Sequence, residues 1–286
     1  MFQNEKAVVR DLCAAMQGAD GATIGGILAA HTAPDWHWRG MHPFYEKQSA
    51  ADVIRDFWKP LKTSLTHMQR REDIFFAGQN VYAEHTETWT CSMGHFVGLF
   101  DQDWLGIPAT RKMVFLPYAE FHKVEDGKIA ETALFIDIIR VMQQAGLDPI
   151  PTQTAARIIQ PGPLNHDGIL LGEHEPQSGQ DTLDLLERMV NDLSILNQTG
   201  DDNCSPDVLA KTWHDDMAWY GPGGIGSVFT IPRYQEQHQH PFRQNLDNKV
   251  FNGHVTRLAE GNYAGWFGWP NLNNTNKGGF LGLPKS

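Results

Sequence analysis

Residues 94–149 read GHFVGLFDQDWLGIPATRKMVFLPYAEFHKVEDGKIAETALFIDIIRVMQQAGLDP, and this stretch decides the fold. Apolar and polar residues alternate through 111–124 and again through 129–139, and a period of two is typical of β-strands. Between them, Glu125 to Lys128 contains Asp-Gly, which favours the positive φ angles of a tight hairpin turn. The stretch therefore predicts an antiparallel hairpin followed by a helix over 138–145.

The residues before this stretch predict helices first and strands afterwards. Apolar residues at helical spacing predict helices over 4–17, 22–31 and 49–61. Period-two alternation then predicts strands over 73–78 and 81–91. Helices followed by a run of antiparallel strands define an α+β domain, in which a curled sheet covers the helices and encloses an apolar pocket.

The opening of this pattern recurs later in the chain. ILAAHTAPDWHWRG (27–40) aligns without a gap to VLAKTWHDDMAWYG (208–221), so that Ile27 corresponds to Val208. The same offset pairs Tyr82-Ala83 with Tyr263-Ala264, and LGIPAT (105–110) resembles LGLPKS (281–286) at a slightly shorter offset. Several matches in one order predict an internal duplication.

The duplication divides the chain into three parts. The first copy occupies 1–150, and the Pro/Gly-rich segment 151–180 is typical of a linker. The second copy occupies 181–286, and it lacks the last two strands that the first copy predicts. GPGGIG (221–226) has no strand–turn–helix setting around it, so we expect a flexible loop at the mouth of the second copy.

Composition limits the classes of partner. The 286 residues carry a formal net charge of −11 without basic runs, which argues against nucleic acid and anionic membranes. No apolar stretch is long enough to span a bilayer, and the N-terminus does not resemble a secretion signal. The three cysteines (Cys13, Cys91 and Cys204) are widely spaced, so we expect a reduced, cytoplasmic protein.

The stretch 94–149 resembles the ending of the SnoaL-like polyketide cyclase family, one of the NTF2-like cone folds. The resemblance lies in G-x-P-x-T (106–110), in F-x-x-x-x-DGKI-x-E (121–131) and in D…QxG (137–146). It implies two tandem NTF2-like cones, each with N-terminal helices packed on a curved antiparallel sheet, the second apparently lacking its last strands. It also implies catalysis without metal or cofactor, with Asp137 as general base and His122 as its partner.

Physical chemistry allows two roles for each of these side chains. Asp137 lies in an apolar run, and burial would raise its pKa towards that of a useful base, but Asp is also a common N-cap, here for the helix over 138–145. His122 follows Phe121 in a strand, so one of them should face the pocket and the other solvent. His95, between two glycines, is a third catalytic candidate at the pocket mouth.

Other residues are candidates for the pocket wall, although aromatic side chains are more often ordinary core residues. In the first copy, Trp38, His42 and Phe44 follow or end the first strand. The second copy supplies a denser set of aromatic, histidine and arginine side chains: Trp219, Tyr220, Arg233, Tyr234, His238, His254 and Trp266. No spacing typical of a metal site occurs among the thirteen histidines, so we expect no bound metal.

These features favour a cofactor-independent acid–base enzyme that acts on a small carbonyl compound by cyclisation, isomerisation or elimination. Two alternatives stay open: a protein that binds a small molecule without chemistry, and a hydrolase of esters or lactones on the same fold. NTF2-like domains often pair through their sheets, so a homodimer through the sheet faces is also expected. Convergent ionisable groups in the pocket would favour an enzyme, and a purely apolar lining would favour binding.

Overall fold

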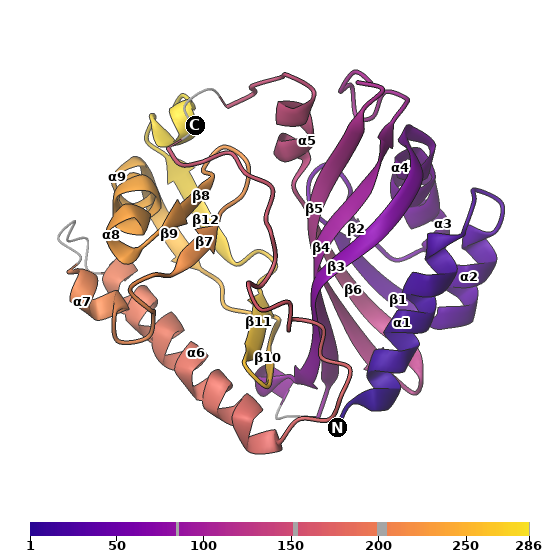
Figure 1. Ribbon diagram of the computed structural model, residues 1–286, viewed down its shortest axis with the longest axis horizontal. Coiled ribbons are helices and arrows are strands. Elements are labelled where there is room, and N and C mark those ends of the chain that lie inside the picture. The colour runs from indigo at the N-terminus through magenta and orange to yellow at the C-terminus, as the bar shows by residue number, and fades with distance from the viewer. Residues whose placement is uncertain (84–85, 151–153, 199–204, 286) are drawn as a thin grey trace.

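The computed structural model describes residues 1–83, 86–150, 154–198 and 205–285. The first half begins with helices and then forms the main sheet (Figure 1). Its helical segments are α1 (Gln3–Gln17), α2 (Ile24–His31), α3 (Ala50–Val53), the π-helical turn η1 (Ile54–Trp58), α4 (Lys59–Ser64), the 3₁₀ turn η2 (Val81–Ala83) and α5 (Ile138–Gln144). Its strands are β1 (Thr32–Gly40), β2 (Tyr45–Lys47), β3 (Leu65–Gln79), β4 (Thr88–Phe100), β5 (Met113–Glu125) and β6 (Lys128–Ile136).

The six strands form one sheet in the order β2-β1-β6-β5-β4-β3. The predicted hairpin is confirmed: β5 and β6 pair antiparallel with Glu125 opposite Lys128, and Asp126 and Gly127 adopt φ angles of 48° and 72°. The expectation of a wholly antiparallel sheet is wrong, because β1 runs parallel to β6. The chain returns to β1 only with β6, after the intervening helices and strands, and such a long connection lets the two strands run in the same direction.

Both faces of this sheet are buried, and they pack against different parts of the chain. Helices α1 to α4 lie on the inner face, where Leu116, Tyr118 and Val124 of β5 join the main core. The second half of the chain lies on the outer face, where Phe121 packs in a separate cluster with Phe267. Phe121 and His122, which are neighbours in β5 and face opposite sides of the sheet, are therefore both buried.

The second half contains more helices and three two-stranded sheets. Its helical segments are α6 (Pro176–Gln198), α7 (Pro206–Leu209), α8 (Ile231–Tyr234), the π-helical turn η3 (Gln235–Gln239), α9 (His240–Asn245) and the 3₁₀ turn η4 (Phe280–Gly282). Its strands are β7 (Ala218–Tyr220), β8 (Ser227–Phe229), β9 (Leu246–Phe251), β10 (Thr256–Glu260), β11 (Tyr263–Phe267) and β12 (Leu272–Asn276). Helix α6 begins inside the segment 151–180 that the sequence predicts as a linker, while residues 151–153 lie outside the described ranges.

Several of these elements repeat the first half at the offset found in the sequence. Under the alignment that pairs Ile27 with Val208, segments α8, η3 and α9 (231–245) have the same bounds as α3, η1 and α4 (50–64). Strand β9 begins at Leu246, the counterpart of Leu65 at the start of β3. The described strands of the second half nevertheless pair only two by two, so a second complete cone stays a prediction.

A buried ion pair joins the two halves. Lys6 of α1 is 2% exposed, and its Nζ lies 2.5 Å from Oε1 of Glu260 in β10. The same Nζ donates to the carbonyl of Leu170 at 2.7 Å, and Oε2 of Glu260 accepts from the backbone N–H of Ala77 at 2.8 Å. None of the helices in the described part of the chain is both long and apolar enough to cross a membrane.

Candidate active site

A cluster of charged side chains lies inside the cone, on the inner face of the sheet. Glu120 and His122 of β5 are each 2% exposed, and two-residue alternation places both beside Tyr118 on that face. Arg70 of β3 reaches the same place, with Nη2 2.5 Å from Oε2 of Glu120. Nε2 of His122 lies 3.3 Å from the same carboxylate oxygen.

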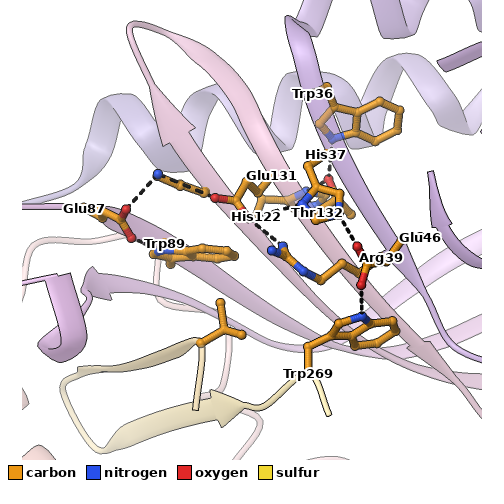
Figure 2. A network of polar contacts seen from close by, with 12 residues as sticks. Trp36, His37, Arg39, Glu46, Glu87, Trp89, His122, Glu131, Thr132 and Trp269 are labelled. Carbon is orange, nitrogen blue, oxygen red and sulfur yellow. Dashed lines mark hydrogen bonds and ion pairs between the residues drawn. The ribbon is translucent and has the colours of Figure 1, made fainter. Parts of the chain in front are cut away.

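A second contact fixes the other edge of the histidine ring. Nδ1 of His122 lies 2.9 Å from Oγ1 of Thr132, which is its cross-strand neighbour in β6. The same hydroxyl oxygen accepts a hydrogen bond of 2.9 Å from Nε1 of Trp36 in β1. Figure 2 shows Trp36, Thr132 and His122 in this chain of contacts. The imidazole is therefore held in one orientation by side chains from three strands.

Electrostatics keep the central carboxylate ionised. Burial acts to raise the pKa of Glu120, but the charge of Arg70 and the neighbouring His122 outweigh it and lower that pKa to about 2. The guanidinium of Arg70 also stacks on rings, with its Cζ 4.6 Å from the ring centre of Tyr118 and 5.1 Å from that of Phe96. A fixed negative charge thus lies between a permanent cation and an imidazole.

Two buried polar atoms in this cluster make no well-formed hydrogen bond: Nη1 of Arg70, and Nε2 of His122, whose one polar contact is with Glu120 at 3.3 Å. Both side chains line a cavity of about 30 Å³, which has room for one or two water molecules. Buried polar atoms without partners are uncommon in folded proteins and call for an explanation. The other residues around the cavity are Leu12, Cys13, Met16, Gln17, Leu28, Trp36, Trp38, Trp58, Met68, Phe96, Glu120 and Thr132.

Asp137 does not lie in this cluster. It is the N-cap of α5, and its Oδ1 accepts from the backbone N–H of Arg140 at 3.0 Å. Its Oδ2 accepts from the backbone N–H of Gly223 at 2.7 Å. The loop 221–226, predicted to be flexible, is therefore packed on the start of α5. A Cβ atom at Gly223 would lie 2.7 Å from Cγ2 of Ile139, so the close approach needs glycine.

His95 and His122 lie on opposite faces of the sheet. His95 pairs with Pro117 in β5, and its ring packs edge-on against Phe115 at 5.6 Å. Its Nδ1 lies 3.3 Å from Oδ2 of Asp73. Burial lowers the pKa of His95, and the charge of Asp73 partly opposes that effect. The two histidines therefore cannot act on one substrate atom.

The first-half wall candidates lie in different places. Trp38 and Phe44 are buried in the main core, 6.5 Å apart between ring centres, and Trp38 also borders the interior cavity. His42 is exposed, and its Nδ1 lies 2.7 Å from the hydroxyl of Tyr45. His42 lines a larger pocket between the two halves instead.

The second-half candidates form several groups. Trp219 stacks on His238 with ring centres 4.3 Å apart, and Tyr234 lies against both. Burial lowers the pKa of His238 to about 4. The remaining candidates lie apart: Arg233 pairs with Glu236 at the surface, Tyr220 lines the pocket between the halves, and His254 contacts Trp266 and Arg257.

Sequence reasoning missed Arg70, Glu120 and Thr132. The signal for Glu120 is present, because it lies two residues before His122 in a predicted strand and so shares its face. The sequence predicts that either Phe121 or His122 faces solvent. Both are buried, since the second half covers the face that carries Phe121.

The same strands carry a second polar network on the outer face (Figure 2). Glu131 accepts from Nη1 of Arg39 at 2.5 Å, and Nε2 of His37 lies 2.9 Å from Oε2 of Glu46. Oε1 of Glu46 accepts from the indole N–H of Trp269 in the second half at 2.6 Å. This network ties the second half to the β1–β2 edge. In the described part of the chain, no group of three or more His, Cys, Asp or Glu side chains is placed to hold a metal ion.

Comparison with solved structures finds SnoaL-like polyketide cyclases and NTF2-like proteins. A SnoaL-like polyketide cyclase from Jannaschia sp. CCS1 is 18% identical over 49% of this chain and 90% of its own, with a TM-score of 0.37. An NTF2-like protein from Burkholderia thailandensis E264 is 21% identical, and the match covers 48% of this chain and 94% of its own, with a TM-score of 0.37. AclR from Streptomyces galilaeus, named as a hydroxylase, is 18% identical, and the match covers 49% of this chain and 80% of its own, with a TM-score of 0.41.

The Jannaschia and Burkholderia structures carry the names SnoaL-like and NTF2-like that the sequence resemblance suggests. No protein-family model matches the chain, and no curated protein matches it.

Proposed function

We propose that this protein is an acid–base enzyme that removes a proton from carbon next to a carbonyl group, inside the cone of the first half. The observation that carries the proposal is the buried triad Arg70–Glu120–His122, in which Nη1 of Arg70 makes no hydrogen bond and Nε2 of His122 contacts only Glu120, at 3.3 Å. Convergent ionisable groups distinguish a catalytic pocket from one that only binds an apolar ligand.

His122 is the proposed base. Oγ1 of Thr132 has two lone pairs, so it can accept from both the Trp36 indole and the Nδ1–H of His122. In that tautomer Nε2 carries no proton and lies beside Glu120. When Nε2 takes the proton, the carboxylate of Glu120 at 3.3 Å stabilises the imidazolium that forms. A positioned base of this kind contributes roughly 10²–10⁴-fold to a rate.

Arg70 is the proposed electrophile. The electron pair of the broken C–H bond moves to the carbonyl oxygen, which becomes an enolate. A free N–H on Nη1 of Arg70 can hold that oxygen, because Nη2 alone binds Glu120. Cyclisation, isomerisation and elimination all share this first step. The cavity of about 30 Å³ fits only part of a substrate, so the flexible side chains of Met16 and Met68 must move on binding.

This proposal moves the base from Asp137 to His122. Both oxygens of Asp137 already accept backbone N–H groups, which is the arrangement of a helix cap and of a loop anchor. We also propose that residues 181–286 arose as a second copy of the same domain. The shared bounds of the helical segments, at the same offset as the sequence repeat, support that origin.

Deuterium exchange tests the proposed reaction. Butan-2-one is incubated with the protein in D₂O, and loss of its α-proton signals is followed by ¹H NMR. We expect exchange above the buffer rate with the wild type, and a fall to the buffer rate with His122→Gln. The matched control is His95→Gln, a buried histidine on the opposite face, which should exchange like the wild type. Equal loss in both variants, or no loss in either, would contradict the proposal.

A further inference from the structure

The two halves of the chain enclose a second, larger pocket. It has a volume of about 760 Å³, which is in the range of sites for small organic molecules. The first half supplies the middle of β5, the end of β6 and the start of α5. The second half supplies Tyr220 and Pro222, and Gln160 comes from the segment between the halves. The pocket therefore exists only because the two halves pack together.

The lining is mainly aliphatic and adaptable. Methionine has a flexible, polarizable side chain that adjusts to the shape of an apolar ligand. The apolar side chains contributed by methionine, isoleucine and leucine are Met41, Met93, Met142, Ile136, Ile138, Ile139 and Leu105. This composition fits a flexible hydrocarbon chain.

A second pocket lies beside the first on the outer face of the sheet. It has a volume of about 410 Å³ and lies between β3–β6 and β11. Met93, Ala119 and Phe135 line both pockets, so the two spaces are neighbours across a shared wall. An occupant that fills both must be long and narrow rather than compact.

Asp137 supplies the carboxylate of the larger pocket, and the other polar side chains in its lining are His42, Tyr118, Gln160 and Tyr220. The Asp137 carboxylate borders the pocket, and each of its oxygens keeps a lone pair after accepting one backbone N–H. Nε of Arg140 lies 3.8 Å from Oδ2, but Arg140 does not line the pocket, so an occupant meets the carboxylate alone. A neutral group that donates a hydrogen bond therefore fits beside Asp137. A carboxylate would meet a like charge there.

We propose that this pocket binds a molecule with a single aliphatic chain and an uncharged, hydrogen-bond-donating head, of the class of long-chain alcohols. The site is separate from the proposed acid–base site. Ala119 and Met93 lie on the outer face of the sheet, whereas Glu120 and His122 lie on its inner face. Binding also links the halves, so a ligand should stabilise the whole chain.

Isothermal titration calorimetry with decan-1-ol and with decanoate tests the proposal on the full-length chain. We expect one molecule of decan-1-ol to bind per chain, at least tenfold more tightly than decanoate at pH 7.5. Ala119→Trp, which fills the shared wall, should abolish binding. Ala51→Trp, at an exposed position on α3, is the control and should bind like the wild type.

Further variants keep the test decisive. If Ala119→Trp lowers the melting temperature, Met142→Trp on the opposite wall replaces it. Asp137→Asn keeps an N-cap residue but removes the negative charge. The affinities for decan-1-ol and decanoate should then differ by no more than about threefold. Binding of decan-1-ol to His122→Gln at wild-type strength would separate this site from the proposed catalysis. No binding of decan-1-ol, equal affinity for both ligands in the wild type, or unchanged binding in both tryptophan variants would overturn the proposal.

Discussion

The carboxylate of Asp137 accepts a hydrogen bond of 2.7 Å from the backbone N–H of Gly223, which lies 86 residues further along the chain. The same side chain caps α5 through the backbone N–H of Arg140. One carboxylate thus fixes the end of the main sheet, the helix that follows it and a loop of the second half. Its main contribution is expected to be to stability.

Asp137→Ala should therefore destabilise the protein without removing the proposed acid–base activity. Loss of the N-cap costs about 1–2 kcal/mol, and the N–H of Gly223 loses its partner as well. Urea denaturation measures this loss, and deuterium exchange of butan-2-one measures activity. Asp137→Asn should be milder, because asparagine also caps helices. Abolished exchange with unchanged stability would instead return the catalytic role to Asp137.

Removing one partner of the buried Lys6–Glu260 pair should be more damaging. Lys6→Met leaves the carboxylate of Glu260 buried with a single N–H donor, and an uncompensated buried charge costs roughly 3–5 kcal/mol. Equilibrium unfolding in guanidinium chloride measures the free energy. Adding Glu260→Gln to Lys6→Met should recover part of the loss, because the remaining side chain is then neutral. Additive losses in the double variant would show that the two side chains do not interact.

The sequence predicts the first-half fold well because its signals are local. Alternation over 111–124 and the Asp126-Gly127 turn depend only on neighbouring residues, and the structure confirms both. The parallel pairing of β1 with β6 joins strands that lie far apart in the sequence, and no local pattern records it. The sequence predicts that either Phe121 or His122 faces solvent, but both are buried. Phe121 is covered by Phe267, which is distant in the sequence, and no local pattern records that contact either.

The candidate site is predicted only in part. His122 is a candidate from the sequence alone, but its partner Arg70 comes from β3, 50 positions before Glu120, and a sheet register is needed to bring them together. Asp137 is the opposite case, a residue that the sequence predicts in the site and that the structure places outside the cluster. Its apolar surroundings in sequence suggest a buried base, while its hydrogen bonds belong to a cap and to a loop whose approach the sequence does not reveal.

Glu120 should make stability depend on pH in the acid range. Its folded pKa of about 2 lies below the ordinary value of 4.5, so the unfolded chain binds the proton first as pH falls. The stabilisation is fully present above pH 4.5 and is lost as pH falls towards 2, on the order of 3 kcal/mol in all. The free energy of unfolding, measured by urea denaturation at a series of pH values, should fall less steeply with decreasing pH in Glu120→Gln than in the wild type. An unchanged slope in that variant would contradict the assignment.

His238 should confer a separate acid sensitivity on the second half. Burial holds its folded pKa at about 4, below the ordinary value of 6.5, so its imidazole is neutral in the folded protein. The unfolded chain takes up the proton first, and stability falls by on the order of 3 kcal/mol as pH drops from 6.5 through 4. The counterpart of His238 in the first half is Phe57, which packs on Trp38 as His238 packs on Trp219.

His238→Phe should therefore remove this part of the pH dependence and keep the ring packing. Thermal unfolding at pH 8 and at pH 5 measures both effects: the difference in melting temperature between the two pH values should shrink, with little change at pH 8. His238→Gln removes the same titration but also the ring, so it should shrink the difference while lowering the melting temperature at pH 8. If both variants keep the wild-type difference, another group carries the acid sensitivity and His238 is not the buried neutral histidine described here.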